Sequence, residues 1–340
     1  MKIKNGFILP SSAYTVPISK IKEYHIIDKK PEVGDLVYGT ISYIGAHLSL
    51  ENKKGRIHSI NDGSKAIFVY GNRYAPDHYE GFVPEDNQPI VDLLSRSGII
   101  GKVSYKNSLI GDPTQVKILG YVCDQDKNII NTLNYSKITI KNKIKTKNRA
   151  KLILCIGTSM NSGKSTAAAA CCWTLSNMGY NVRGSKITGT ASLKDLLLMS
   201  DNGASIITDF TYFGHPSTYL LPEHELLNIF NIFDLKYANN SKNYWVVEIA
   251  DGILQRETSM LLQNKDIISR IHKLIFCAGD ALGVIGSLSI LKSQFNLIPD
   301  AISGKCSTSP LSIRELQNYC DIPIFNSLEK NIKQISKIIL

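Results

Sequence analysis

The sequence predicts an α/β protein with a doubly wound, mostly parallel sheet that follows a smaller β-rich N-terminal domain. From residue 151 onward, short apolar runs alternate with helix-forming segments. Such alternation is typical of strand–helix–strand units, which build a parallel sheet covered on both faces. Before residue 137, short β-type runs are separated by turn residues instead. A chain of 340 residues is long enough for both domains.

The N-terminal domain is expected to span residues 1–136. Its clearest candidate strands are 35–44, 65–70 and 115–122, and a helix is expected near 90–97. Short strands joined by polar turns are typical of a small β-barrel or sandwich. The polar, aromatic stretch at 71–81 is bounded by glycines, so it is either a ligand-contacting loop or an ordinary surface turn.

Residues 137–150 are expected to form a basic linker. The net charge of the chain is +10, and part of it is concentrated in this segment and the residue after it. The basic residues there are Lys137, Lys141, Lys143, Lys145, Lys147, Arg149 and Lys151. No aromatic residue after Tyr135 lies among these charges, which favours a solvated linker over a nucleic-acid surface. Nucleic acid remains a less favoured partner.

The C-terminal domain is expected to span residues 151–340. Strands are predicted at 151–156, 181–187, 205–210, 244–250, 273–278 and 299–303, with a short one at 322–325. Helices are predicted at 164–179, 191–200, 222–235, 256–264, 281–295, 310–319 and 327–337. Ligands of such folds bind at the carboxyl ends of the strands, so the residues that follow strands are the candidate site.

The first strand of this domain leads into a glycine-bounded loop and then into a helix rich in small residues. Backbone N–H groups at a helix start hold phosphate oxygens, a lysine adds positive charge, and a serine hydroxyl can bind Mg²⁺. The loop therefore predicts a P-loop that binds a nucleoside triphosphate, with Lys164 at the β- and γ-phosphates and Thr166 near the α-phosphate. The expected nucleotide-binding residues are Gly157, Thr158, Ser159, Asn161, Ser162, Gly163, Lys164, Ser165 and Thr166.

The loop and three later segments resemble the dethiobiotin synthetase-like family of P-loop proteins. The family's Gly-Thr-x-x-x-x-Gly-Lys-Ser/Thr spacing is present from Gly157 to Ser165. Lys186-Ile187-Thr188-Gly189 is similar to the family's Lys-Pro-Val-x-x-Gly segment, and the strand end at 246–252 is similar to its Val-Glu-Gly-Ala-Gly-Gly. The helix start at 281–287 resembles Leu-Gly-x-Ile-Asn, and the resemblance covers about residues 151–326.

This sequence also departs from the family pattern. Ile187 stands in place of the proline, and Ile249 and Asp251 replace two glycines. The spacing from Lys186 to Asp195 is short for the family. The fold and the nucleotide chemistry are therefore carried over from the resemblance, and the family's own substrate is not.

The resemblance also implies roles in metal binding, catalysis and substrate contact. Ser165, Asp195 and Glu248 would bind Mg²⁺, and Asp209 and Asp251 are alternatives. Glu248 also ends an apolar run, which places its carboxylate at the expected active edge. Lys164, Lys186 and Glu248 would be catalytic, with Lys186 neutralising charge on a transferred phosphoryl group. The expected substrate contacts are Thr188, His215, Ser217 and Thr218.

The function implied is an ATP- and Mg²⁺-dependent ligase or phosphotransferase. It would activate the carboxylate or carbamate of a small-molecule acceptor by phosphoryl transfer. The Asn-Lys-x-Asp pattern that reads guanine is absent from the sequence, which favours ATP. A homodimer is also implied, because the related family builds its site near a two-fold interface.

Two other classes of function stay open. One is a nucleoside-triphosphate-driven switch, although Ser159 stands where such relatives often carry an extra lysine, and His/Cys clusters are missing. The other is a nucleic-acid-associated ATPase that uses the basic linker.

Composition favours a cytoplasmic protein. The sequence has no apolar run of about eighteen residues, which a membrane span would need, and its N-terminus lacks the apolar stretch of a secretory signal. Its seven cysteines include no Cys-x-x-Cys pair, so we expect buried free thiols rather than disulfides or a metal cluster.

Overall fold

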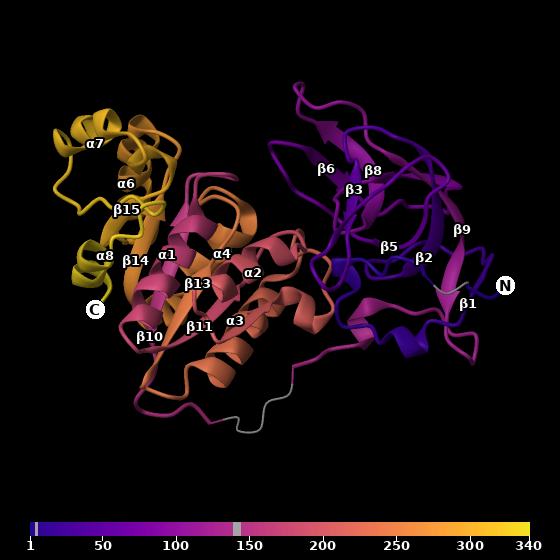
Figure 1. Ribbon diagram of the computed structural model, residues 1–340, viewed down its shortest axis with the longest axis horizontal. Helices are drawn as coiled ribbons and strands as arrows, with labels where there is room; N and C mark the ends of the chain where they lie inside the picture. The colour runs from indigo at the N-terminus through magenta and orange to yellow at the C-terminus, as the bar shows by residue number, and fades with distance from the viewer. Residues whose placement is uncertain (4–5, 139–143) are drawn as a thin grey trace. The chain divides into compact units, whose positions relative to one another are not determined.

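The computed structural model of the chain describes residues 1–3, 6–138 and 144–340 (Figure 1). It divides the chain into two compact units. The first comprises Met1–Thr139 together with two later segments, Thr190–Lys194 and Phe210–Leu220. The second comprises Ile140–Gly189, Asp195–Asp209 and Leu221–Leu340. The boundary predicted at 136/137 did not anticipate that two loops of the C-terminal part belong to the N-terminal unit.

The first unit is built around a small closed barrel. Strand pairings run from β2 to β5, β8, β7 and β9 and return to β2, with β5–β8 parallel and the other four pairs antiparallel. The strands are β1 (Glu23–His25), β2 (Leu36–Tyr43), β3 (Ser49–Glu51), β4 (Ile57–Ser59), β5 (Lys65–Tyr70), β6 (Tyr79–Phe82), β7 (Ile90–Leu93), β8 (Ile99–Lys106) and β9 (Gln115–Cys123). β1 pairs with β9, β6 pairs with β8, and β3 pairs with β4.

One element of this unit corrects the prediction. Residues 90–97 were expected to be helical, but Ile90–Leu93 form β7. Val91 and Leu93 are buried, and the backbone pairs with both β8 and β9. The Asp92 carboxylate accepts a hydrogen bond from the Val103 N–H at 2.9 Å. Closing the barrel therefore outweighs the local helix preference of the segment.

Short 3₁₀ turns complete the first unit. They are η1 (Ser11–Ala13), η2 (Ile18–Lys20), η3 (Thr132–Asn134) and η4 (Phe210–Phe213). The last of these lies in a segment that follows a strand of the second unit. Tyr212 of η4 packs on Tyr14, with ring centroids 5.0 Å apart, and its carbonyl accepts the Lys137 N–H at 2.8 Å. These contacts explain why the segment belongs to the barrel unit.

The second unit is a six-stranded parallel sheet in the order β12-β11-β13-β10-β14-β15. Its strands are β10 (Lys151–Gly157), β11 (Asn181–Lys186), β12 (Ile206–Asp209), β13 (Asn243–Glu248), β14 (Ile271–Cys277) and β15 (Ala301–Ser303). Its helices are α1 (Lys164–Asn177), α2 (Leu193–Asp201), α3 (Glu223–Tyr237), α4 (Arg256–Gln263), α5 (Lys265–Arg270), α6 (Ala281–Phe295), η5 (Lys305–Ser307), α7 (Pro310–Gln317) and α8 (Ile332–Ile339). α2 begins in the first unit and continues in the second.

Helices cover both faces of this sheet (Figure 1). On β13, Tyr244 and Val246 belong to the core that α1 and α8 share. Trp245 points to the opposite face, because side chains alternate along a strand, and packs on Phe230 of α3 with ring centroids 5.3 Å apart. The sheet is therefore doubly wound, and the predicted fold class is confirmed.

Two short elements near the C-terminal end of the chain differ from expectation. The strand expected at 322–325 forms only a parallel bridge between Ile302 and Ile324. The helix expected from residue 327 begins at Ile332, because the Asn331 side chain caps it by accepting the Gln334 N–H. α5 was not anticipated and is capped in the same way by Asn264.

The cysteines are free thiols. Six of the seven are buried, and Cys320 is partly exposed. Burial raises the pKa of the Cys306 thiol to about 11, so it stays protonated near neutral pH. Among the residues that the structure describes, no helix is long and apolar enough to cross a bilayer.

Two basic residues of the predicted linker have partners inside the second unit. Asp234 of α3 is fully buried and forms an ion pair with Arg149, whose guanidinium also donates to the Asp234 carbonyl at 2.9 Å. Lys145 lies 3.7 Å from the same carboxylate, and Arg270 Nε lies 3.0 Å from it. Lys141 and Lys143 lie outside the described residues. At least part of the linker charge is therefore neutralised within the protein.

Replacing Asp234 with alanine should destabilise the protein by about 3–5 kcal/mol, because two guanidinium groups would lose their buried counter-ion. Urea unfolding of the purified variant measures this change. Asp321→Ala removes an exposed carboxylate of the same unit and should change stability by less than about 0.5 kcal/mol. Equal effects of the two substitutions would contradict a structural role for Asp234.

Candidate active site

The charged residues of the candidate site lie at the carboxyl ends of neighbouring strands. Lys186 of β11 is in register with Glu248 of β13, and Glu248 is in register with Cys155 of β10. Side chains in register on adjacent parallel strands point to the same face of a sheet. For Glu248 this is the face of Val246, which α1 covers. The alternation of side-chain direction along each strand thus places both charges on the face that α1 covers.

The loop between β10 and α1 is fixed by backbone hydrogen bonds to three other strand ends. The Thr158 N–H donates to the carbonyl of Cys277, the last residue of β14, at 2.9 Å. The Ile253 N–H donates to the Gly157 carbonyl at 3.0 Å, and the Lys305 N–H donates to the Ser162 carbonyl at 3.1 Å. The end of β14 and the segments after β13 and β15 therefore shape the loop together.

Two glycines permit this close packing. Gly163 caps α1 with φ +104°, and Gly304 has φ +92°, a backbone conformation that side chains disfavour. A Cβ atom at Gly304 would lie 2.2 Å from the Ser162 carbonyl oxygen. The loop pattern in the sequence predicts a role for Gly163 but not for Gly304. The Ser303-Gly304-Lys305 sequence at a strand end was the available signal.

The lysine and serine that open α1 have defined partners. The Lys164 ammonium is almost fully buried and donates to the Ser159 carbonyl of the loop at 2.7 Å. The Ser165 hydroxyl donates to Glu248 Oε1 at 3.1 Å. The other carboxylate oxygen, Oε2, is buried and has no hydrogen-bond partner among the described residues. A buried carboxylate oxygen without a donor is poorly stabilised, and a cation would satisfy it.

Glu248 sits in a balance of opposing effects. Burial raises the pKa of its carboxyl group, while the nearby Lys186 and Lys164 lower it. The net pKa is above its ordinary value. Bound Mg²⁺ would favour the ionised form, because an opposite charge at close range stabilises a carboxylate.

Lys186 forms a hydrogen-bonded ion pair with Asp195 of α2. Burial alone would lower the pKa of Lys186, but the carboxylates of Asp195 and Glu248 raise it above its ordinary value. The ammonium therefore stays charged at neutral pH. The short spacing from Lys186 to Asp195 does not prevent the two from meeting.

The described residues contain no group of three or more His, Cys, Asp and Glu side chains arranged to hold a metal. Mg²⁺ does not require such a group, since it commonly takes one or two carboxylates and completes its shell with water and phosphate oxygens. Ser165, Glu248 and Asp195 offer one hydroxyl and two carboxylates on the same side of the sheet. Asp209, also buried, lies in register with Lys186 on the side away from Glu248.

The residues expected to contact substrate have structural partners. The Thr188 hydroxyl is fully buried, donates to the Ala250 carbonyl and accepts the Ala250 N–H at 2.9 Å. It thereby ties the end of β11 to the end of β13. Thr188 is thus placed as a structural clamp between two strand ends, and its contact with substrate stays a prediction.

His215, Ser217 and Thr218 lie in the segment that belongs to the first unit. Ser217 and Thr218 are buried, and Ser217 Oγ accepts the Tyr219 N–H at 3.0 Å. Tyr219 in turn hydrogen-bonds Glu80 of the barrel. This aromatic segment is held by packing on the barrel, which the pattern of polar residues alone did not reveal.

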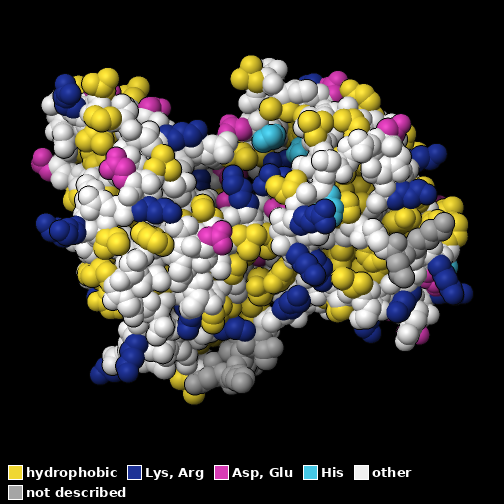
Figure 2. All heavy atoms as spheres, in the orientation of Figure 1, with side chains coloured by type: hydrophobic (Ala, Val, Ile, Leu, Met, Phe, Trp, Pro, Cys, Tyr) yellow, Lys and Arg dark blue, Asp and Glu magenta, His cyan; other side chains and the backbone are white. Residues whose placement is uncertain are grey.

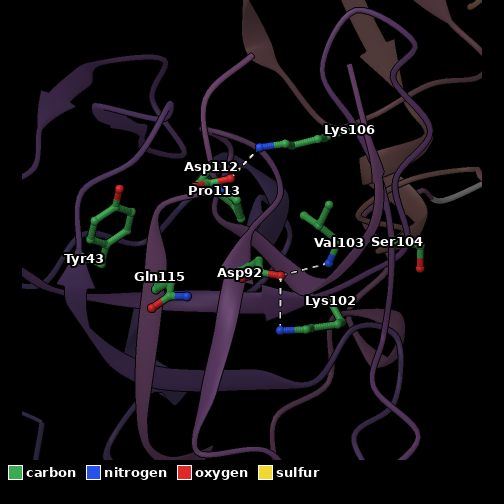
Figure 3. Close-up of a pocket in the computed structure, with 9 residues that line it drawn as sticks. All are labelled: Tyr43, Asp92, Lys102, Val103, Ser104, Lys106, Asp112, Pro113 and Gln115. Carbon is green, nitrogen blue, oxygen red and sulfur yellow. Dashed lines mark hydrogen bonds and ion pairs between the residues drawn. The ribbon is translucent and has the colours of Figure 1, made fainter. Parts of the chain in front are cut away.

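The barrel carries an open hollow of about 600 Å³ (Figure 3). Two lysines line it, and both are ion-paired: Lys102 lies 3.8 Å from Asp92, and Lys106 pairs with Asp112. Tyr43 forms part of the rim. Because its lysines are already neutralised, we assign no ligand to this hollow.

Comparisons with known proteins give distant matches in structure. No family model and no curated protein sequence matches the chain. Among solved structures, the chain is similar to the signal recognition particle receptor FtsY from Elizabethkingia anophelis in complex with GDP, with 12% identity and a TM-score of 0.36 over 60% of this chain. The match spans 64% of the length of that FtsY chain.

A ParA family ATPase from Chlorobium tepidum is similar at 14% identity and a TM-score of 0.37, covering 57% of this chain and 97% of that one. FtsY from Mycoplasma mycoides is similar at 13% identity and a TM-score of 0.34, covering 56% and 64%. The second unit has a P-loop NTPase fold. That assignment rests on the strand, loop and helix described above, because such low identities and TM-scores carry no functional information.

Replacing Gly304 with alanine should weaken nucleotide binding by about tenfold or more, because the new Cβ would collide with the Ser162 carbonyl and displace the loop. Titration with a fluorescent nucleotide measures the change. Gly279→Ala is the matched control, since a Cβ there meets no atom within 4 Å. Unchanged affinity in Gly304→Ala would show that the loop does not bind the nucleotide.

Proposed function

We propose that the second unit binds ATP with Mg²⁺ and transfers its γ-phosphoryl group to the carboxylate or carbamate of a small-molecule acceptor. The observation that carries this proposal is the hydrogen bond from Ser165 to Glu248, which leaves a buried carboxylate oxygen unsatisfied beside the phosphate-binding lysine. The reaction class follows the resemblance to the dethiobiotin synthetase-like family. Stated more specifically, we propose a ligase or phosphotransferase of that type.

Each residue has a role that its position supports. The N–H groups at the start of α1 would hold phosphate oxygens, joined by the Lys164 ammonium once it leaves the Ser159 carbonyl. Ser165, Glu248 and Asp195 would hold the metal, which when bound neutralises phosphate charge. Lys186 stays protonated and would offset the charge that develops on the transferred group.

The choice of ATP rests on the sequence. The strand end at Ser303 lacks the pattern that reads guanine, and the Gly304 turn packs directly on the loop. A cytoplasmic homodimer is part of the same proposal, taken from composition and from the resemblance.

A nucleoside-triphosphate-driven switch is the second candidate. One observation favours it: Thr188, Ser217 and Thr218, the hydroxyls expected to contact an acceptor, are buried. A nucleic-acid-associated ATPase has less support, because Lys145 and Arg149 of the linker are near or paired with Asp234. Lys and Arg side chains on the face shown in Figure 2 lie on both units.

Purified protein should bind ATP in the presence of Mg²⁺, and Lys164→Ala should weaken binding about 10- to 100-fold because a charged phosphate contact is lost. Lys292→Ala, which removes an exposed lysine of α6, should bind as the wild type does. Calorimetric titration measures both. Binding that is equal in wild type and Lys164→Ala would contradict the proposal.

Turnover separates the two candidates. Hydrolysis that stays slow until a pool of small carboxylates or amines is added supports phosphoryl transfer to an acceptor. Steady hydrolysis that ignores added metabolites supports the switch.

Glu248→Gln should keep nucleotide affinity in EDTA but lose most of the tightening that Mg²⁺ brings, because a neutral amide is a poor ligand for this hard cation. Titrations with and without Mg²⁺ measure the difference. Glu315→Gln, an exposed position on α7, is the matched control. Full Mg²⁺ dependence in Glu248→Gln would remove Glu248 from the metal site.

A further inference from the structure

The start of α2 is held by the barrel unit. Thr190–Lys194 belong to the first unit, whereas Asp195, the next residue, belongs to the second. α2 begins at Leu193, so the helix that carries Asp195 has its first residues in the barrel unit. Asp195 is the carboxylate that pairs with Lys186.

One buried carboxylate caps this helix from the barrel side. Glu51, at the end of β3, is 1% exposed, and its Oε1 accepts the Leu193 N–H at 2.9 Å. The first N–H groups of a helix lack partners within the helix, and a negative charge there is favourable. Such caps normally come from a neighbouring residue, but here the cap lies 142 positions away in the sequence.

Both sides of this contact are held in place. The Glu51 N–H donates to the Arg96 carbonyl at 2.7 Å, which fixes the glutamate backbone in the barrel. In the turn before α2, the Ala191 N–H donates to the Pro216 carbonyl at 3.0 Å, and Thr190 forms a β-bridge with Ser217. The turn and the cap therefore define where α2 begins.

We infer that Glu51 is a positioning residue of the nucleotide site. By fixing the first turn of α2, it sets the Asp195 carboxylate against Lys186 and against the cation proposed above. This inference rests on the proposed function. It also assigns a task to Glu51, which fixes the first turn of the helix that carries Asp195.

Glu51 could instead serve stability alone, and the two roles give different results. If the cap only stabilises the fold, its removal would lower the melting temperature without changing the Mg²⁺ dependence of nucleotide binding. If Glu51 acts through Asp195, its removal changes that Mg²⁺ dependence. The change disappears once Asp195 is neutralised.

The test uses Glu51→Ala and Glu51→Gln in the full chain, alone and combined with Asp195→Asn. Glutamine retains an acceptor oxygen for the Leu193 N–H, so it should restore most of what alanine loses. Glu85→Ala, an exposed glutamate of the same unit, is the control. Two quantities are measured: the Mg²⁺ concentration at half-maximal tightening of ATP binding, and hydrogen–deuterium exchange of residues 193–201.

Glu51→Ala should raise the half-maximal Mg²⁺ concentration about tenfold, the equivalent of one hydrogen bond to a charged group. It should leave ATP affinity in EDTA unchanged and speed exchange at the start of α2. In the Asp195→Asn background, Glu51→Ala should not raise the half-maximal Mg²⁺ concentration further. An unchanged Mg²⁺ requirement, or an equal increase with and without Asp195, would overturn the inference.

Two further outcomes are informative. If Glu51→Ala does not fold, the Mg²⁺ requirement of Asp195→Asn carries the test. A requirement unchanged in Asp195→Asn would refute the positioning role, because Glu51 would then have no metal-binding residue to act through. If the wild type binds no nucleotide, the proposed function fails. Exchange of α2 then still shows whether Glu51 holds the helix, so the two failures are distinguishable.

Discussion

The buried carboxylate of Glu248 is the constraint on which the proposed nucleotide site depends. A carboxylate removed from water is stable only when donors or cations surround it. The Ser165 hydroxyl satisfies one oxygen, and Lys186 and Lys164 supply positive charge nearby. The central position of β13, between β11 and β10, brings these groups together, because register places charged side chains from adjacent strands at one edge.

The phosphate-binding loop shows the same dependence on its surroundings. Its shape is set by hydrogen bonds from Thr158, Ile253 and Lys305 across the strand ends, and not by its own sequence alone. Contact with Gly304 leaves no room for a side chain. This external support explains how a loop with five residues between Gly157 and Gly163 can still present its N–H groups at the start of α1.

Local patterns in the sequence were sufficient for much of the second unit. α6 begins and ends where its pattern predicts, since Asp280 caps its start by accepting the Gly283 N–H. Prediction failed where distant contacts decide the structure. Residues 90–97 have a local preference for helix, but strand pairing within the barrel makes Ile90–Leu93 a strand. No spacing rule joins Glu51 to Leu193, and no pattern marks Ser217 as a residue packed on the barrel. The positions of side chains at strand ends were predictable from the sequence. The unit to which each connecting loop belongs was not.

Binding of Mn²⁺ in place of Mg²⁺, followed by electron paramagnetic resonance with and without ATP, tests the metal–nucleotide site most directly. We expect one Mn²⁺ per chain to bind tightly only when ATP is present, and both Ser165→Ala and Glu248→Gln to weaken it. Tight ATP binding with no bound Mn²⁺, or Mn²⁺ binding that both variants leave unchanged, would contradict a site built on Ser165 and Glu248.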